Sequence, residues 1–485
     1  MQDERYVASA DLGSGKIAIS VAKIDGDDVQ IVYYRESHSE GIVNSIVRNP
    51  SKAASAMKEA VSEAEKELNI KINQIVVGLP RAGVQQQVKC ATLKRSNPDS
   101  CITMEEIDAL KNMALDSYPL EDEEKQEIYG AVAQNFSADD LINQSEDDIE
   151  GTISDSIEGN FKIFVGNKKA VSNITAMANM AGMTLARQYF VPDAVAKAVL
   201  TSGEMENGVA LVEIGAEATS LTIYHNDILR HYSAIPFGGG DITSDIKYEC
   251  GFKKELAENI KLAYGSCQPE KLQNLSDKIL QINDEENGTY EHLTVHYLAE
   301  IINARTREII DAILWLIQDS GYADKLRDGI VITGGGANLV GICSLFKEMS
   351  GYRVRIGYPR VRHFCSSVCP GVSETSASAS IGLILKAKED KYINCVGELP
   401  AKPETPETEE EGETEDYGGT VFESGSVIEP GRGKRSRNRG RDKEKAGKAN
   451  NITWADKLAE KVSSRLGTAF DSTLGTIFDD MGKEQ

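Results

Sequence analysis

Apolar and polar positions alternate along residues 6–34, and a period of two is typical of half-buried β-strands. The alternation predicts three short strands, VASADL, KIAISVAKI and VQIVYY, joined by Gly-Ser-Gly and Asp-Gly-Asp-Asp turns. The period then lengthens to that of a helix over residues 51–68, where the apolar positions are Ala53, Met57, Ala60, Val61, Ala64 and Leu68. A buried strand, QIVVGLP, follows. The start of the chain therefore predicts an α/β unit.

A second strand–turn–strand segment, ALVEIGAEATSLTIY, resembles the first because a carboxylate ends its first strand. Asp11 holds this position in the first segment and Glu213 in the second. A glycine turn allows the backbone to approach a phosphate, and a carboxylate at a strand end can hold a metal ion through water. A third glycine turn, at residues 334–336, lies between the strand GIVIT and a helix. The three turns predict a duplicated domain that closes around a nucleotide.

The pattern changes over residues 83–165, where three β-like runs surround a helix at residues 104–117. This stretch reads as a small inserted domain. Helical periodicity returns at residues 168–182 and 192–202, and a mostly helical block covers residues 241–320. Its apolar stripe is more typical of a core than of a cofactor surface; it consists of Leu298, Ile301, Ile302, Ile309, Ile313 and Leu316.

The end of the chain has a different composition. A Pro/Glu/Thr-rich run and then a strongly basic run cannot bury enough apolar area to offset chain entropy, and they predict a disordered linker. Beyond it, apolar residues recur at helical spacing, with lysines and an arginine nearby in the first half. An amphipathic helix of this kind lies on a bilayer rather than across it. Packing on the protein body or in a partner's groove is the alternative.

Composition excludes several classes of protein. The net charge of −23 over 485 residues argues against a nucleic-acid binder, because phosphates would be repelled. No secretory h-region and no membrane-spanning run of about 18–20 apolar residues is present, so we expect a cytoplasmic protein. The eight cysteines are scattered, which suits a reducing compartment. Cys365 and Cys369 lack a second pair and are expected to be free thiols.

These segments together resemble the actin, sugar-kinase and heat-shock-chaperone ATPase superfamily. Within it the chain is similar to the FtsA family of bacterial actin-like division proteins, through SADLGSGKIAI, HSEGIVNSIV, HYSAIPFGGGDITSDI, IINARTREII, DGIVITGGGANLVGI and GVSETSASASIGLIL. The resemblance extends to about residue 390, and the insertion at 83–165 lies where that family has its distinctive subdomain. It implies an α/β fold of duplicated ribonuclease-H-like domains around a nucleotide cleft.

The resemblance divides the chain into segments. The first actin-like core takes residues 1–82 and 166–202 with a return segment at 365–392, and the second takes 203–240 and 321–364. The insertion at 83–165, a helical subdomain over the nucleotide at 241–320, a disordered linker at 393–450 and a membrane-targeting helix at 451–485 complete the chain.

The resemblance also implies that ATP and Mg²⁺ lie between the two halves. The residues expected around the nucleotide are Asp11, Gly13, Ser14, Gly15, Lys16, Gly215, Thr219, Gly238, Gly239, Gly240, Glu258, Lys261, Gly334, Gly335, Gly336 and Asn338. Asp11 is also the expected metal ligand. For Glu258 and Lys261, an exposed ion pair between neighbouring helix turns is the alternative.

The second phosphate loop departs from the family pattern. FtsA-like proteins usually have Asp-Ile-Gly-Gly-Gly-Thr-Thr there, whereas this chain differs at four of these positions, with Glu213, Ala216, Glu217 and Ala218. The Glu217 carboxylate beside a γ-phosphate would cost on the order of 4 kcal/mol at about 4 Å and an effective dielectric of 20, so we expect it to turn away or to be bridged by a metal. Val191 stands where an acidic residue is expected before Pro192. Both departures predict negligible turnover of ATP.

The implied function is that of an adaptor that polymerises and ties filaments of FtsZ, the tubulin-like division protein, to the cytoplasmic membrane at the septum. Arg305 and Glu308 are expected to receive the FtsZ C-terminal tail, with a plain helix-surface ion pair as the alternative. The insertion would contact a neighbouring protomer or other division proteins. The residues expected to contact anionic lipid are Trp454, Leu458, Val462, Leu466 and Phe470. The rival functions are a metabolic kinase or other ATPase of the superfamily and an actin-like pilus-assembly adaptor.

Overall fold

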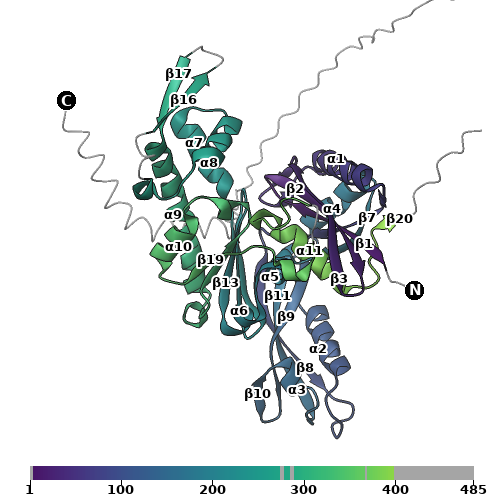
Figure 1. Ribbon diagram of the computed structural model, residues 1–485. Coiled ribbons are helices and arrows are strands. Elements are labelled where there is room, and N and C mark those ends of the chain that lie inside the picture. Colours follow the sequence, from purple (N-terminus) through teal and green to yellow (C-terminus); the bar gives the residue numbers. More distant parts are fainter. Residues whose placement is uncertain (1–3, 273–277, 285–288, 366–368, 398–485) are drawn as a thin grey trace, which may run out of the picture. The chain divides into compact units, whose positions relative to one another are not determined.

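A computed structural model describes residues 4–272, 278–284, 289–365 and 369–397 (Figure 1). The chain divides into two compact units, Met1–Leu399 and Pro400–Gln485. The second unit, with the predicted terminal helix and its lipid-contacting residues, lies outside the described residues. None of the helices in the described ranges has both the length and the apolar character needed to cross a membrane.

The first sheet has the strand order β12-β7-β1-β2-β3. Its strands are β1 (Arg5–Leu12), β2 (Lys16–Asp25), β3 (Asp28–His38), β7 (Gln74–Gly78) and β12 (Thr184–Tyr189). The first three strands are antiparallel neighbours, whereas β7 runs parallel to β1 and to β12. The predicted strand hairpin followed by a helix and a buried strand is confirmed.

The second sheet repeats this arrangement, with the strand order β15-β14-β13-β18-β19. Its strands are β13 (Val209–Ile214), β14 (Thr219–His225), β15 (Ile228–Ile235), β18 (Ile330–Thr333) and β19 (Val354–Ile356). Again three antiparallel strands adjoin two parallel ones. Since β13 corresponds to β1 in order and in sense, the predicted duplication is confirmed.

Helices pack on these sheets through small and apolar side chains. Their bounds are α1 (Pro50–Leu68), α4 (Lys168–Met180), α5 (Val191–Val199), α6 (Ser202–Asn207), α10 (Ile342–Ser350) and α11 (Ser378–Glu389). Helix α1 begins after Asn49, whose side chain accepts a hydrogen bond from the Lys52 N–H, and ends at Asn69 in the left-handed conformation. A methyl group at Gly382 of α11 would lie 2.2 Å from the Ala194 carbonyl oxygen of α5, so these two helices require a glycine at their contact.

The insertion has its own sheet, in the order β10-β9-β11-β8, and its own apolar core. Its elements are β8 (Gln85–Lys94), α2 (Met104–Asp116), β9 (Gln126–Ala138), β10 (Leu141–Gln144), α3 (Glu146–Ile149) and β11 (Ser156–Asn167). The Arg95 guanidinium is fully buried and donates to the Glu106 carboxylate and to the carbonyls of Ser100, Cys101 and Ser154. One arginine thus joins α2 to two loops of the insertion.

Residues 241–320 contain the helices α7 (Gly239–Cys250), α8 (Lys254–Tyr264) and α9 (Val295–Asp319). The expectation of a mostly helical block is incomplete, because β16 (Ile279–Asp284) and β17 (Thr289–Thr294) form an antiparallel hairpin between α8 and α9. Five of the six stripe residues on α9 are buried, as predicted for a core face, and Ile301 is half-buried.

The expected linker begins too early at residue 393. Residues 393–397 belong to the first compact unit, because β20 (Val396–Gly397) pairs with β6 (Lys71–Ile72). The Cys395 N–H donates to the Tyr6 carbonyl, and the Cys395 side chain is fully buried. Apolar residues that return to a sheet therefore precede the low-complexity run.

His231 on β15 attaches this strand to the insertion. Its Nδ1 accepts a hydrogen bond from the Gln86 amide of β8, and its Nε2 lies 3.1 Å from the Ser233 hydroxyl. Burial, and secondarily the nearby Lys162 charge, lower the pKa of His231 to about 4. An imidazole with a lowered pKa binds its proton more readily in the unfolded chain, so stability decreases as pH falls from about 6.5 towards 4.

We predict that the wild-type chain loses about 2 kcal/mol more unfolding free energy between pH 7 and pH 5 than the His231→Gln variant does. Gln keeps polar groups at this position but does not titrate. Urea unfolding at the two pH values measures the difference, with His296→Gln on the exposed part of α9 as the control. Equal pH dependence in wild type and His231→Gln would contradict this role.

Candidate functional site

The first glycine turn connects β1 to β2 and leaves little space inside the hairpin. A methyl group at Gly13 would lie 2.8 Å from the Lys16 carbonyl oxygen. Lys16 points to the Glu36 carboxylate, with which it forms an ion pair, and its Nζ donates to the Ser376 carbonyl at 3.1 Å. Burial would raise the pKa of Glu36, but hydrogen bonds from Lys16 and Tyr34 outweigh burial and lower it. The Lys16 ammonium group thus already pairs with groups of the chain itself.

The second glycine turn connects β13 to β14 and rests on the start of α7. The Gly239 N–H donates to the Gly215 carbonyl at 2.9 Å, and the Gly240 N–H donates to the Ala216 carbonyl at 2.6 Å. A methyl group at Gly238 would lie 2.5 Å from the Gly215 carbonyl oxygen, so only glycine permits this approach. Thr219 donates to the Phe237 carbonyl at 2.8 Å. The predicted second-loop residues and the predicted glycines 238–240 therefore pack directly against each other.

Glu217 turns away from its own loop, one of the two outcomes expected for it. Its carboxylate accepts the Asn44 N–H at 2.9 Å, and the neighbouring Ser45 N–H donates to the Ser14 hydroxyl at 2.8 Å. Both donors lie at the tip of a hairpin made by β4 (Ile42–Val43) and β5 (Ile46–Val47). Their φ angles of 49° and 57° aim successive N–H groups at the two loops. This hairpin tip bridges the first and second glycine turns.

The third glycine turn packs on the end of β13. Gly334 has a φ of 85°, and a methyl group there would lie 2.5 Å from the Ile214 carbonyl oxygen. Gly336 contacts the same residue closely, whereas nothing lies within 4 Å of a methyl group at Gly335. The Asn338 side chain is held by the Thr375 hydroxyl at 3.0 Å. The structure thus brings the three predicted turns together and leaves open space at Gly335.

Glu258 and Lys261 connect α8 to the start of α7. The Lys261 ammonium donates to the Glu258 carboxylate at 2.7 Å, to the Gly239 carbonyl at 2.8 Å and to the Thr243 hydroxyl at 2.8 Å. The ion pair that was the alternative for these residues is present, but the Lys261 side chain is only 11% exposed and lies against the start of α7.

Arg305 and Glu308 lie together on α9. The Arg305 guanidinium makes two hydrogen bonds to Asp245 of α7, at 2.6 and 2.9 Å, and one to Glu308 at 2.7 Å. The helix-surface ion pair expected as the alternative is therefore present here. A peptide carboxylate would have to compete with two carboxylates of the chain itself for this arginine.

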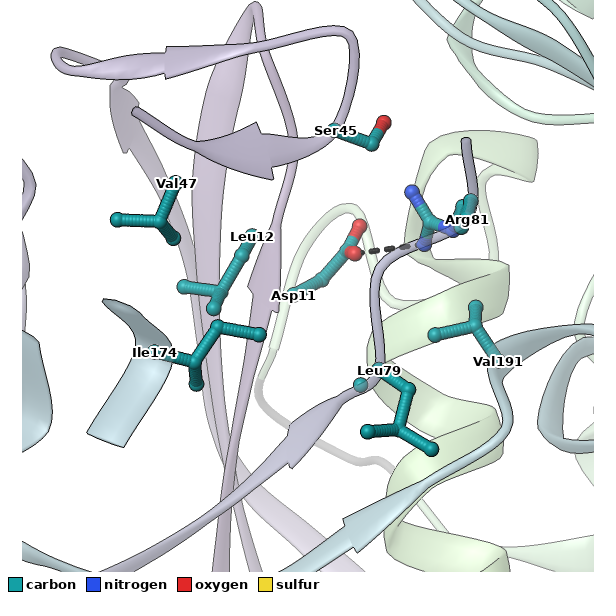
Figure 2. Close-up of a pocket in the computed structure, with 9 residues that line it drawn as sticks. Asp11, Leu12, Ser45, Val47, Leu79, Arg81, Ile174 and Val191 are labelled. Atoms are coloured by element: carbon teal, nitrogen blue, oxygen red, sulfur yellow. Dashed lines mark hydrogen bonds and ion pairs between the residues drawn. The ribbon is translucent and has the colours of Figure 1, made fainter. Parts of the chain in front are cut away.

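Sequence reasoning missed Arg81, which lies between the two strand-end carboxylates. Its Nη2 is 2.7 Å from Asp11 Oδ1 and 3.4 Å from Glu213 Oε1. Figure 2 shows the contact with Asp11 at the edge of a cavity of about 10 Å³, enough for about one water molecule. Arg81 follows β7, which is parallel to β1, so the position after a strand next to β1 was the available signal.

Burial and charge act against each other in this cluster. Burial raises the pKa of Glu213, and the Arg81 charge opposes that rise. Burial would lower the pKa of Arg81, but Asp11 and then Glu213 hold it above its usual range. The guanidinium is therefore charged at any pH at which the protein is folded.

Val191 lines the same cavity, and a methyl group at Gly78 would lie 2.2 Å from its Cγ2 atom. An apolar side chain fills the position at which a water-activating carboxylate was expected (Figure 2). Within the described residues, no three His, Cys, Asp or Glu side chains gather as a metal centre would need. Because Arg81 already contacts Asp11 and Glu213, their arrangement does not fit a cation bound directly to Asp11.

Comparisons with known proteins show which sequences this chain is similar to. A family model described as FtsA, Cell division protein FtsA, matches residues 210–382. The Cell division protein FtsA of Neisseria meningitidis is 28% identical over 364 residues, which cover 74% of this chain and 85% of that relative. The protein of the same name from Borreliella burgdorferi is 25% identical over 402 residues, or 82% and 94% of the two chains.

A solved structure, the PilM-PilN type IV pilus biogenesis complex, is similar at 15% identity with a TM-score of 0.55, covering 79% of this chain and 98% of that one. This likeness concerns the fold. The matches by sequence extend over most of the chain and carry a consistent name. The chain therefore has an actin-like fold, and over most of its length its sequence is similar to the FtsA family of cell-division proteins.

Proposed function

We propose that this protein is an actin-like division adaptor that binds ATP in the cleft between its two duplicated sheets, with negligible turnover. The observation that carries the nucleotide part is the meeting of three glycine turns, from the ends of β1, β13 and β18, around Asp11 and Glu213. Glycine turns at strand ends suit phosphates, and the open side of Gly335 suits a base or ribose.

Negligible turnover follows from the groups around the cleft. Val191 is apolar and buried, so it cannot activate water. Lys16 pairs with Glu36, and Glu217 accepts a backbone N–H, so both side chains are committed to holding structure. A cleft built in this way favours bound nucleotide as a structural ligand. The rival function, a metabolic kinase or other ATPase of the same superfamily, requires a catalytic carboxylate in this place.

We predict that Gly335→Leu weakens binding of labelled ATP by about tenfold or more while leaving the unfolding free energy nearly unchanged. The new side chain would enter space that is open in the free protein. Gly203→Leu is the matched control, because a methyl group at Gly203 in α6 also meets nothing within 4 Å. Phosphate release with excess ATP is measured alongside binding.

Equal ATP affinity in Gly335→Leu and wild type would remove the third turn from the nucleotide site. Sustained phosphate release by the wild-type chain would favour the kinase or ATPase function instead. An absence of binding in the wild type would mean that the cleft holds no nucleotide.

The adaptor part of the proposal is supported by similarity to the FtsA family and by the composition of the chain after residue 398. We propose that the segment at 451–485 attaches the protein to the cytoplasmic face of the membrane at the septum, peripherally, through anionic lipids. A single weak helix would bind firmly only when many copies assemble in a filament. FtsZ, bound through its C-terminal tail near Arg305 and Glu308, would then be tethered to the bilayer.

We predict that full-length protein carries FtsZ into the pellet with anionic vesicles, whereas a chain ending at Asn450 does not. Within the full chain, Leu458→Glu should reduce pelleting about tenfold, because a charge enters the apolar stripe. Ser464→Glu adds the same charge off the stripe and is the control. Equal pelleting of the full and shortened chains would refute the membrane anchor.

The same pelleting experiment also tests the proposed contact with FtsZ. Arg305→Ala should reduce FtsZ recovery while leaving vesicle binding intact. Arg307→Ala removes a neighbouring arginine of α9, paired with Glu348, and serves as the matched control. Unchanged FtsZ recovery with Arg305→Ala would place the tail elsewhere.

A further inference from the structure

Contacts that do not involve the charge of Arg81 hold its backbone in place. The Tyr232 hydroxyl donates to the Arg81 carbonyl at 2.6 Å, and the Tyr232 ring packs edge-on against Phe164 and Phe190. Two residues earlier, the Leu79 N–H donates to the Tyr189 carbonyl at 2.8 Å. The backbone that carries the guanidinium is therefore anchored on both sides, and the side chain starts from a defined position.

The guanidinium serves two buried carboxylates from equivalent strands. Asp11 is the next-to-last residue of β1, and Glu213 is the next-to-last residue of β13. The exposed fractions of the three side chains are only 11% for Arg81, 10% for Asp11 and 12% for Glu213. Two carboxylates that approach one another in a buried site repel strongly unless a cation lies between them. Arg81 Nη2 holds that position, within 3.4 Å of both.

Other charged side chains around the cleft are committed elsewhere. Lys16 pairs with Glu36, and Lys261 pairs with Glu258. Glu217 accepts a backbone N–H from the hairpin tip. Arg81 is therefore the cation that the described part of the cleft offers to Asp11 and Glu213.

The cluster also has unused hydrogen-bonding capacity. Arg81 Nε and Glu213 Oε2 are buried and have no hydrogen-bond partner within the described residues. An arginine has five N–H donors, and the two carboxylate contacts use only the Nη2 group. Buried donors without partners are costly unless a ligand or water meets them. Phosphate oxygens are well matched to a planar guanidinium.

We propose that Arg81 is the resident cation of this cleft: it takes the place of a divalent metal between Asp11 and Glu213 and donates to a phosphate oxygen of the bound nucleotide, so that binding needs no Mg²⁺. The phosphate part of this inference rests on the proposed nucleotide binding. The metal part does not, since it concerns only the two carboxylates and the arginine.

The metal part is tested without nucleotide, by titrating the full chain with Mn²⁺ and following free Mn²⁺ by electron paramagnetic resonance. We expect the wild type and Asp11→Asn to bind Mn²⁺ alike, because Arg81 already occupies the site. Arg81→Gln should gain one tighter Mn²⁺ site, at least about tenfold stronger than the background, and Arg81→Gln combined with Asp11→Asn should lose it. Arg355→Gln, which breaks the partly buried pair with Glu204, is the control and should gain no such site.

A Mn²⁺ site in the wild type that Asp11→Asn removes would overturn the proposal. So would an Arg81→Gln variant that melts like wild type yet gains no site. Should Arg81→Gln fail to fold, the comparison of wild type with Asp11→Asn still decides the question.

The phosphate part is tested by measuring ATP affinity of the full chain in EDTA and in excess Mg²⁺. We expect the two wild-type affinities to agree within about twofold, and Arg81→Gln to bind at least about tenfold more weakly in EDTA and to recover with Mg²⁺. A wild-type affinity that falls about tenfold or more in EDTA would overturn the proposal. Failure of ATP to bind in either buffer would instead reject the proposed nucleotide site. The Mn²⁺ titration would still test whether Arg81 takes the place of a divalent metal between Asp11 and Glu213.

Discussion

The ion pair of Arg81 with Asp11 and Glu213 is the interaction on which the arrangement of the two sheets depends. Duplication places a carboxylate at the end of β1 and another at the end of β13, and both become buried when the sheets meet. Neither charge could stay buried without a cation, because desolvation would favour its neutral form. A single guanidinium from the turn after β7 contacts both, so the same residue that offsets their charge also joins the two halves.

Hydrogen bonds between loops extend this connection. The second glycine turn accepts two N–H groups from the start of α7, and the third turn packs on the end of β13. The hairpin tip at Asn44 and Ser45 then links the first turn to the second. The contacts of the second and third turns require close approach of backbones, which explains why glycine recurs there. In contrast, the insertion depends on a separate core and on Arg95, so its stability is largely its own.

Much of the fold could be predicted because its signals are local. The alternation of apolar and polar residues predicted β1 to β3, and apolar residues at helical spacing predicted α1. Asp11 and Glu213 were singled out because each carboxylate precedes a glycine turn. The partner of Glu217 could not be predicted, since it is a backbone N–H that lies 173 residues away. Arg81 was missed for the same reason: its role depends on two strands that only tertiary structure brings together. The hairpin of β16 and β17 was hidden by the strongly helical segments on either side.

The bridge at the hairpin tip is made by main-chain donors, and this affects how the family can diverge. Side chains at 44 and 45 take no part in the two hydrogen bonds that cross to Ser14 and Glu217. Any pair of residues that tolerates a left-handed backbone, such as Asn, Asp or Gly, would preserve them. Such substitutions at residues 44 and 45 would therefore preserve both hydrogen bonds. Loss of the connection would be visible in the sequence only at the acceptor residues, Ser14 and Glu217. A homologue with glycine at the position of Glu217 lacks this acceptor, however similar its hairpin looks in sequence.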